Sequence, residues 1–306
     1  MTILYNRVAL IGLGLIAGSM SLAMRRAGVA GEITGYARSS ETRNTAREIG
    51  LVDHVCDTAL DAVKDADLVV LAVPVGAMGT VMAEIAPALK QGAVVTDVGS
   101  VKGDIFASVL PHLPEQAEFI GTHPMAGTEH SGPNSGFAEL FDKRWCLIVP
   151  PEGASETEIQ RLEKFWRALG SDTKRMEAEH HDLVCAVVSH TPHLIAYTMV
   201  GVADDLSRVT DQEVIEFSAA GFRDFTRIAA SDPTMWRDVF LSNKDATLEI
   251  LGRFTEELFA LQRAIRIGDG DHLHDYFTRT RAIRRGIIEA GQDTDAPNFG
   301  RHSDAT

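Results

Sequence analysis

The stretch VALIGLGLIAGS, residues 8–19, decides the fold. An apolar run typical of a buried strand leads into Gly12-x-Gly14-x-x-Ala17, and residues 15–28 continue with the length and spacing of a helix. In this context the pattern predicts a dinucleotide-binding loop. Gly12 allows the tight turn, Gly14 lets the backbone approach a pyrophosphate, and Ala17 permits close packing of helix on strand. A purely structural glycine turn is the alternative.

The rest of the first half alternates strand-like and helix-like segments. Strand-like segments are found at 7–11, 32–36, 65–75, 92–100, 118–124, 145–150 and 171–176, and helical ones at 15–28, 77–90 and 156–169. This alternation predicts an α/β, Rossmann-like domain with a mostly parallel sheet over residues 1–178. From 179 to 290 only helical spacing is seen, which predicts an all-α domain. The polar tail 291–306 is expected to be disordered, with no regulatory domain after it.

Composition excludes several classes of protein. The chain has 306 residues, 45% of them hydrophobic, a formal charge of −14 and three widely spaced cysteines. A negative charge spread along the chain argues against a nucleic-acid partner. We find neither a continuous apolar run long enough for a membrane span nor a secretion signal. Few, unpaired cysteines suggest a reducing compartment. We therefore expect a cytoplasmic enzyme that acts on a small molecule.

The end of the second strand bears on the choice of cofactor. An NAD site normally has an acidic residue there, but this chain has Tyr36-Ala37-Arg38-Ser39-Ser40. Arg38 and Ser39 favour NADP⁺, because they can bind a 2′-phosphate. A solvated Arg38, with NAD⁺ bound through other contacts, is the alternative. Leu15, Ile16, Val73 and Pro74 complete the predicted cofactor-binding residues.

Two segments after later strands carry candidate catalytic groups. Ser100 lies in DVGSVK (97–102), where a parallel strand ends and where ligands bind in open α/β sheets. It could instead be only the N-cap of the next helix. His123 lies in GTHPMAGTEHSG (121–132), between residues that interrupt regular structure. This position favours a functional histidine over a buried structural one.

The helical half adds candidate substrate-binding groups. Ser189 and His193, in VSHTPH (188–193), are four residues apart and so share a helix face. His190 and His193 lack further ligands at a familiar spacing, so we expect no metal. The segment 222–227, FRDFTR, offers guanidinium groups for a carboxylate, although a surface salt bridge is the usual role of such residues.

Taken together, GLGLIAGS, DVGSVK, GTHPMAGTEHSG, VSHTPH and GFRDFTRIAASDPTMWRDVFLSNK resemble the prephenate/arogenate (cyclohexadienyl) dehydrogenase family of tyrosine biosynthesis. The resemblance covers about residues 6–285. It implies a Rossmann-like domain, a helical domain that forms a homodimer, and NAD(P)⁺-dependent oxidative decarboxylation of prephenate, arogenate or both.

The resemblance also implies roles for individual residues. His123 accepts the hydrogen bond of the ring hydroxyl, and Ser100 orients His123 and the cofactor. Arg227 holds the ring carboxylate, and His193 contacts the carboxylate of the side chain. Thr128, Glu129, Asp224 and Ser189 complete the predicted substrate-binding residues. Glu129 is the candidate partner for the ammonium group of arogenate, or else a surface carboxylate or an ion pair that closes the site.

Two other functions stay open on the residues alone. One is a β-hydroxyacid dehydrogenase or ketopantoate-reductase-like enzyme, since those families share a Rossmann domain followed by a helical dimer domain. They use a lysine on the helical domain, whereas residues 179–230 contain none. The other is a non-catalytic, NAD(P)-sensing dimer.

Overall fold

The computed structural model describes residues 2–207 and 216–289. By internal contacts the chain divides into two compact units, Met1–Leu248 and Glu249–Thr306. The predicted boundary at 178/179 falls inside the first unit, at the start of a helix, and stays a prediction. The predicted disordered tail, 291–306, lies outside the described residues.

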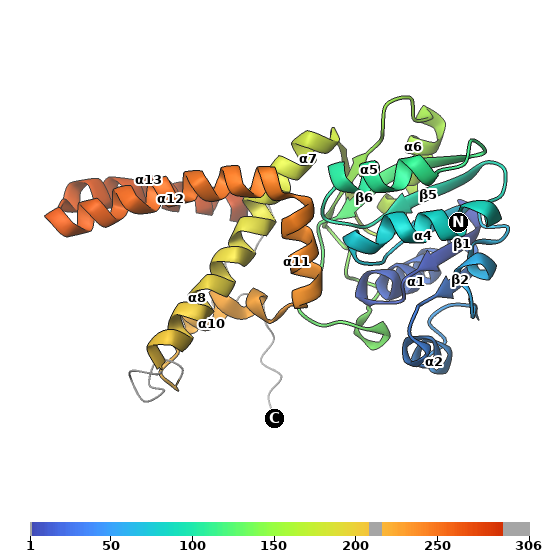
Figure 1. Ribbon diagram of the computed structural model, residues 1–306, viewed down its shortest axis with the longest axis horizontal. Coiled ribbons are helices and arrows are strands. Elements are labelled where there is room, and N and C mark those ends of the chain that lie inside the picture. The colour runs from blue at the N-terminus through green and yellow to red at the C-terminus, as the bar shows by residue number, and fades with distance from the viewer. Residues whose placement is uncertain (1, 208–215, 290–306) are drawn as a thin grey trace. The chain divides into compact units, whose positions relative to one another are not determined.

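One eight-stranded sheet organises the first unit (Figure 1). Its strands are β1 (Tyr5–Ile11), β2 (Ala30–Tyr36), β3 (His54–Val55), β4 (Leu68–Leu71), β5 (Ala93–Asp97), β6 (Ala117–Pro124), β7 (Trp145–Val149) and β8 (Asp172–Arg175). Their order is β3-β2-β1-β4-β5-β6-β7-β8. All neighbours are parallel except β6 and β7, which confirms the mostly parallel sheet. Strand order reverses between β1 and β4, where ligands bind in folds of this type.

Helices cover both faces of this sheet. They are α1 (Leu15–Ala27), α2 (Ser40–Glu48), α3 (Ala59–Val63), α4 (Met78–Ile85), α5 (Gly103–Val109) and α6 (Glu156–Ala168), with the 3₁₀ turns η1 (Val75–Ala77), η2 (Ala86–Ala88), η3 (Leu110–His112) and η4 (Pro133–Ser135). Side chains of β1 alternate between two cores: Val8 and Leu10 pack with α1 and α6, whereas Ala9 and Ile11 pack with α3, α4 and α5. A strand that is buried on both faces has a continuous apolar sequence, and residues 8–11 show this pattern.

The remaining described elements are helical, as predicted. They are α7 (Ala178–Cys185), the π-helical turn η5 (Ala186–His190), α8 (Thr191–Ser207), α10 (Ala220–Thr226), the 3₁₀ turn η6 (Arg227–Ala230), α11 (Pro233–Ser242), α12 (Lys244–Ile267) and α13 (Gly270–Glu289). Within the first unit, helix α11 packs on the sheet domain, because Trp236 and Val239 share a buried core with residues of α4 and α5. In the second unit α12 and α13 carry exposed apolar side chains, among them Phe259, Ile265 and Phe277.

The helical stretch Ala178–Leu206 requires a correction. By length and composition alone it could cross a membrane, so the expectation that no segment reaches that level was wrong. Only 28% of its most apolar window is buried. The stretch nevertheless includes His181, Asp182 and His190, which bond to His123 in β6, to Gly103 at the start of α5 and to Asn243 just after α11. These contacts make it part of the folded first unit, and the absence of a membrane partner stays a prediction.

Candidate active site

The glycine loop joins β1 to α1 at the reversal point of the sheet. Gly12 has φ +98°, and a Cβ there would lie 2.4 Å from the carbonyl oxygen of Ala72, so only glycine fits. A Cβ at Gly14 would meet no protein atom within 4 Å, and Ala17 is fully buried against the strands. No side chain caps α1 at Gly14. The loop therefore offers helix N–H groups and a close backbone approach, which suit the pyrophosphate of a dinucleotide.

The other predicted cofactor residues border this loop. Leu15 and Ile16 form the first turn of α1, and each is half-buried against the core. Val73 and Pro74 follow β4, the strand that pairs with β1 on the other side of the reversal point. The four residues thus flank the loop at the carboxyl ends of two adjacent strands.

Residues after β2 form the next part of this edge. Gly12 N donates to the carbonyl of Tyr36 at 2.8 Å, which ties the glycine loop to the end of β2. Arg38 is exposed, and its side chain makes no hydrogen bond or ion pair within 2–207 and 216–289. Ser39 is the N-cap of α2, and its hydroxyl accepts from Thr42 N at 3.4 Å. Arg43 donates to the carbonyls of Ala37 and Arg38 at 2.7 and 2.9 Å.

His123 lies near the end of β6 and is 8% exposed. Its Nδ1 lies 2.9 Å from Nε2 of His181, and Nδ1 of His181 lies 2.8 Å from the Asp182 carboxylate. That carboxylate also accepts from the backbone N–H groups of Lys102 and Gly103, at 2.7 and 2.8 Å. A carboxylate, two imidazoles and the start of α5 thus form one hydrogen-bonded chain.

The hydrogen-bond partners assign the ring protons of this chain. Burial raises the pKa of Asp182, but hydrogen bonds from His181, Gly103 and Lys102 outweigh it and leave the pKa below its ordinary value. The ionised carboxylate only accepts, so Nδ1 of His181 donates and Nε2 carries the lone pair. Nδ1 of His123 must then donate to His181. Nε2 of His123 is then left as an acceptor with no donor among residues 2–207 and 216–289, the state that a base requires.

Both histidines are neutral near pH 7. Burial, followed by the nearby His181 ring and Lys102, holds the pKa of His123 well below the ordinary histidine value. Burial also lowers the pKa of His181, despite the opposing hydrogen bond to Asp182. Neutral His123 is therefore a ready hydrogen-bond acceptor.

Lys102 and Asp97 form a fully buried ion pair, and Asp97 contacts Thr122, the residue before His123. Lys102 Nζ is 2.6 Å from Asp97 Oδ2 and donates to the carbonyl of Gly99 at 2.6 Å. Asp97 also accepts from the backbone of Gly99 and Thr122 at 2.7 and 3.3 Å. Every charged atom of the pair has partners, as burial requires. The pair thereby holds the segment after β5 against β6, next to His123.

Ser100 lies in that segment, and the structure contradicts one of the two expectations for it. The N-cap alternative was wrong, because α5 begins at Gly103 and its first N–H groups donate to Asp182. In the part of the chain that the structure describes, His181 rather than Ser100 contacts Nδ1 of His123. The orienting role of Ser100 stays a prediction.

Two further histidines lie where the π-helical turn η5 meets α8: His190 ends the turn, and His193 is in the first turn of α8. Nδ1 of His193 donates to the carbonyl of Ser189 at 2.9 Å, and the ring stacks on Trp236 with centroids 3.7 Å apart. Asn243 lies 3.0 Å from Nδ1 of His190 and donates to the carbonyl of Asp182 at 2.8 Å. Ser189 and His193, predicted to share a helix face, are joined through the backbone carbonyl of Ser189. π-Turns of this kind are frequent at functional sites.

Arg227 and Glu129 form an ion pair between η6 and the loop after β6. Arg227 Nη1 donates to Glu129 Oε2 at 2.8 Å, and the two side chains are 46% and 28% exposed. Thr128, also in that loop, is exposed, and its hydroxyl accepts from His130 N at 3.2 Å. Asp224 is half-buried on α10, three residues before Arg227. The structure thus joins two predicted substrate residues to each other.

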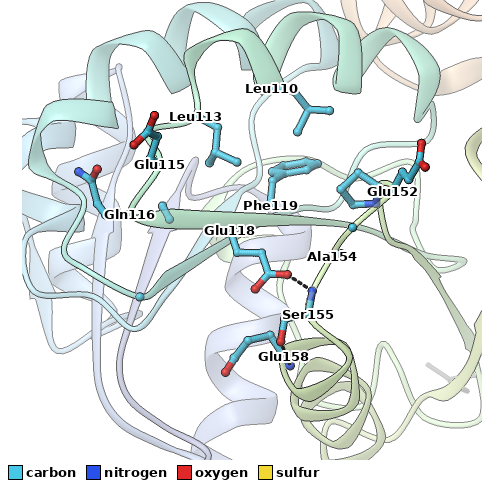
Figure 2. A pocket seen from close by; sticks show the side chains of 14 residues that line it. Leu110, Leu113, Glu115, Gln116, Glu118, Phe119, Glu152, Ala154, Ser155 and Glu158 are labelled. Carbon is cyan, nitrogen blue, oxygen red and sulfur yellow. Dashed lines mark hydrogen bonds between the residues drawn. The ribbon is translucent and has the colours of Figure 1, made fainter.

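An open groove lies at the other end of the same strands. Figure 2 shows it beside the amino end of β6, with Leu110, Phe119 and several carboxylates along its walls. Glu118 in this groove accepts from the backbone of Ser155. Ligands of open α/β sheets bind at the carboxyl ends of strands. The edge formed by the glycine loop, Ser100 and His123 is therefore the candidate active site.

A dinucleotide loop at the strand-order reversal and a neutral histidine at the same edge define a nicotinamide-dependent dehydrogenase. Residues 20–174 match the nucleotide-binding domain of prephenate dehydrogenase, and residues 177–279 match the dimerisation domain of that enzyme. The chain belongs to the prephenate dehydrogenase family.

Individual relatives agree with this assignment. The chain is 39% identical to a cyclohexadienyl dehydrogenase of Zymomonas mobilis, over 92% of this chain and 96% of that one. It is 31% identical to a prephenate dehydrogenase of Bacillus subtilis, over 92% and 76% of the two chains. A crystal structure of prephenate dehydrogenase from A. aeolicus, in complex with hydroxyphenyl propionate and NAD⁺, has a TM-score of 0.85 at 31% identity and covers 92% and 98% of the chains. The β-hydroxyacid and sensor alternatives are not favoured.

Sequence reasoning missed His181, Asp182 and Cys185. The only local signal was that His181 and Cys185 are four residues apart and so share a face of α7. Their closeness to His123 depends on how α7 packs on β6.

Proposed function

We propose that this chain catalyses the oxidative decarboxylation of prephenate and arogenate with NAD(P)⁺, in tyrosine biosynthesis. The observation that carries the proposal is the neutral His123, whose free Nε2 is held as an acceptor by His181 and Asp182. When bound, the nicotinamide ring accepts the hydride of the substrate ring.

His123 handles the proton of the reaction. As the ring C4 loses hydride, its hydroxyl becomes a carbonyl, and Nε2 of His123 accepts the proton. The carboxylate at C1 then leaves as CO₂, its bonding electrons make the ring aromatic, and the phenolate oxygen recovers the proton. The proton that His123 takes from the hydroxyl returns to the product, so His123 is neutral again at the end of each cycle. Charge on His123 in between is stabilised through His181 by Asp182.

Arg227 is the proposed partner of the ring carboxylate. Its present partner is Glu129, and an exposed ion pair of this kind contributes little to stability. A substrate carboxylate can therefore replace Glu129 at small cost. Once released, Glu129 is available to the ammonium group of arogenate, the feature that distinguishes arogenate from prephenate.

The remaining substrate residues have supporting roles in this proposal. His193 is fixed by Trp236 and by the Ser189 carbonyl, to which its Nδ1 donates. Its Nε2 can therefore donate to the side-chain carboxylate of the substrate only when the ring takes up a proton. Thr128 and Asp224 lie near the Arg227–Glu129 pair in sequence and complete the substrate-binding region. Ser100, which follows β5 at the carboxyl edge of the sheet, is proposed to orient His123 and the cofactor.

The proposal includes NADP⁺ as the favoured cofactor. The end of β2 has no acidic residue, and Arg38, Ser39 and the N-terminus of α2 offer positive charge and donors to a 2′-phosphate. Arg38→Ala should raise KM for NADP⁺ roughly 10-fold or more and leave KM for NAD⁺ within about 2-fold. Equal changes for both cofactors would remove Arg38 from 2′-phosphate recognition.

A homodimer in the cytoplasm completes the proposal. The match to the dimerisation domain supports self-association, and the exposed apolar residues of α12 and α13 suit a partner surface. All three cysteines are unpaired, in keeping with a reducing compartment.

The test is a matrix of two substrates and two cofactors. Purified protein is mixed with prephenate or arogenate and with NAD⁺ or NADP⁺, and the reduced cofactor, CO₂ and the aromatic product are quantified. We expect equal amounts of all three products with at least one substrate, and faster turnover with NADP⁺. No reduction with either substrate would refute the proposed function.

A further inference from the structure

Three atoms that can bind a metal lie close together in the core, and one of them belongs to His123, the proposed base. Nδ1 of His123 and Nε2 of His181 are 2.9 Å apart, and Sγ of Cys185 lies 3.6 Å from the first and 3.5 Å from the second. All three residues are buried, and these atoms form a group able to hold a metal ion. They are not the histidines that the sequence suggested, His190 and His193.

The spacing of these atoms suits a tetrahedral ion. Zinc bonds of about 2.0–2.1 Å to nitrogen and about 2.3 Å to sulfur put ligand atoms about 3.3 Å apart for two nitrogens and about 3.6 Å for nitrogen and sulfur. Both nitrogen–sulfur distances agree with that geometry. The two nitrogens need to separate by only a few tenths of an ångström, and a water molecule can supply the fourth ligand.

The surroundings of these three residues supply a carboxylate that can orient a metal-bound histidine. A metal-bound histidine typically donates its other ring N–H to a carboxylate, which orients the ring. His181 already does this, because its Nδ1 lies 2.8 Å from Asp182, whose carboxylate is itself held by the backbone of Lys102 and Gly103. Both imidazoles are neutral, as metal ligands must be.

We propose that Zn²⁺ binds Nδ1 of His123, Nε2 of His181 and Sγ of Cys185, and that this binding reversibly inhibits the enzyme. The metal replaces the hydrogen bond between the two histidines. The proton of His123 moves from Nδ1 to Nε2, so Nε2 becomes a donor and can no longer accept the substrate proton. This inhibitory consequence rests on the proposed function, whereas the metal site does not.

The proton balance gives a direct signature. A cysteine binds a metal as the thiolate, so the Cys185 thiol loses its proton when the metal binds. Formation of the Zn–S bond releases that proton to solvent, and the shift within His123 releases none. Binding should therefore release a single proton per metal ion near pH 7.

The first experiment measures binding without substrate or cofactor. Metal-free protein is titrated with Co²⁺, and the thiolate-to-cobalt charge-transfer band and the visible bands of tetrahedral cobalt are followed. Zn²⁺ should displace the cobalt at one equivalent per chain. Cys185→Ala should abolish the charge-transfer band and weaken Zn²⁺ binding more than about 100-fold, beyond the effect of losing an outer-shell partner.

Controls separate this site from the other thiols. Cys146→Ala removes another buried thiol and should leave the cobalt spectrum unchanged. Cys185→Ser serves if the alanine variant does not fold, and should also lose the sulfur band. The proposed site would be overturned if the cobalt spectrum of the wild type lacked a thiolate band. It would also be overturned if the thiolate band persisted in both Cys185 variants.

The second experiment measures inhibition. Each variant is assayed with and without Zn²⁺ and compared with its own metal-free rate, followed by a chelator. Wild type and Cys146→Ala should lose at least about 90% of their activity and regain it with the chelator, whereas the Cys185 variants should resist. Zinc that binds at Cys185 but leaves wild-type turnover unchanged would overturn the inhibitory role. Failure of the proposed function would instead appear as no activity in metal-free wild type.

Discussion

Replacing Asp182 with Asn tests the hydrogen-bonded chain behind His123. The Asp182 carboxylate accepts from His181 Nδ1 and from two backbone N–H groups, at 2.7–2.8 Å. In Asp182→Asn a donor amide replaces one acceptor oxygen and the negative charge is lost. A charge-assisted hydrogen bond contributes about 1.5–3 kcal/mol, which corresponds to roughly 10- to 150-fold in rate if it acts only in the transition state. We therefore expect kcat to fall by roughly that factor, with KM for prephenate changed less than about 3-fold.

The same substitution also removes one of the two oxygens that accept from the backbone at the start of α5, so stability needs its own control. Thr58 caps α3, far along the chain from His123, and its hydroxyl accepts from Asp61 N at 3.1 Å. Thr58→Ala should lower stability by about 0.5–2 kcal/mol with kcat unchanged. Steady-state kinetics and thermal melts are measured on both variants. A folded Asp182→Asn enzyme with wild-type kcat would refute the role of the chain in holding His123 as an acceptor.

Further predictions concern the substrate residues and pH. Arg227→Ala should raise KM for prephenate roughly 10- to 150-fold with a smaller change in kcat. Arg223→Ala, in the neighbouring helix, should leave this KM unchanged. If Arg227→Ala leaves KM unaltered for both prephenate and arogenate, another cation binds the ring carboxylate. Glu129→Gln should lower kcat/KM for arogenate more than for prephenate, and equal changes would limit Glu129 to its ion pair with Arg227. Burial lowers the pKa of His190 to about 4, so the folded state binds fewer protons than the unfolded state below pH about 6.5. Stability should therefore fall as pH drops from about 6.5 towards 4, and a melting temperature that rises over this range would contradict the assignment.

Much of the fold could be predicted because its signals are local. Strands β1 and β4 are buried on both faces and therefore appear as continuous apolar runs, and Gly12 is needed by the backbone itself. The segment between β2 and β4 was not resolved into elements beforehand. There β3 has only two residues and α3 five, too short for periodicity to identify.

The site was predictable where one segment carries it. His123 stood out because the residues around it interrupt regular structure at a strand end. Its partners His181 and Asp182 come from a helix about 60 residues later, and no local pattern links the two segments. The pairing of Arg227 with Glu129 likewise joins residues 98 positions apart. Such contacts depend on tertiary packing.

The central claim is that His123 accepts the substrate proton, and the most direct test is the turnover of His123→Asn with prephenate and NADP⁺. Loss of a general base should lower kcat by roughly 10²- to 10⁴-fold. The Kd of the cofactor should stay within about 3-fold, and His130→Asn, an exposed histidine in the following loop, should keep wild-type kcat. A folded His123→Asn enzyme whose kcat matches wild type would contradict the account.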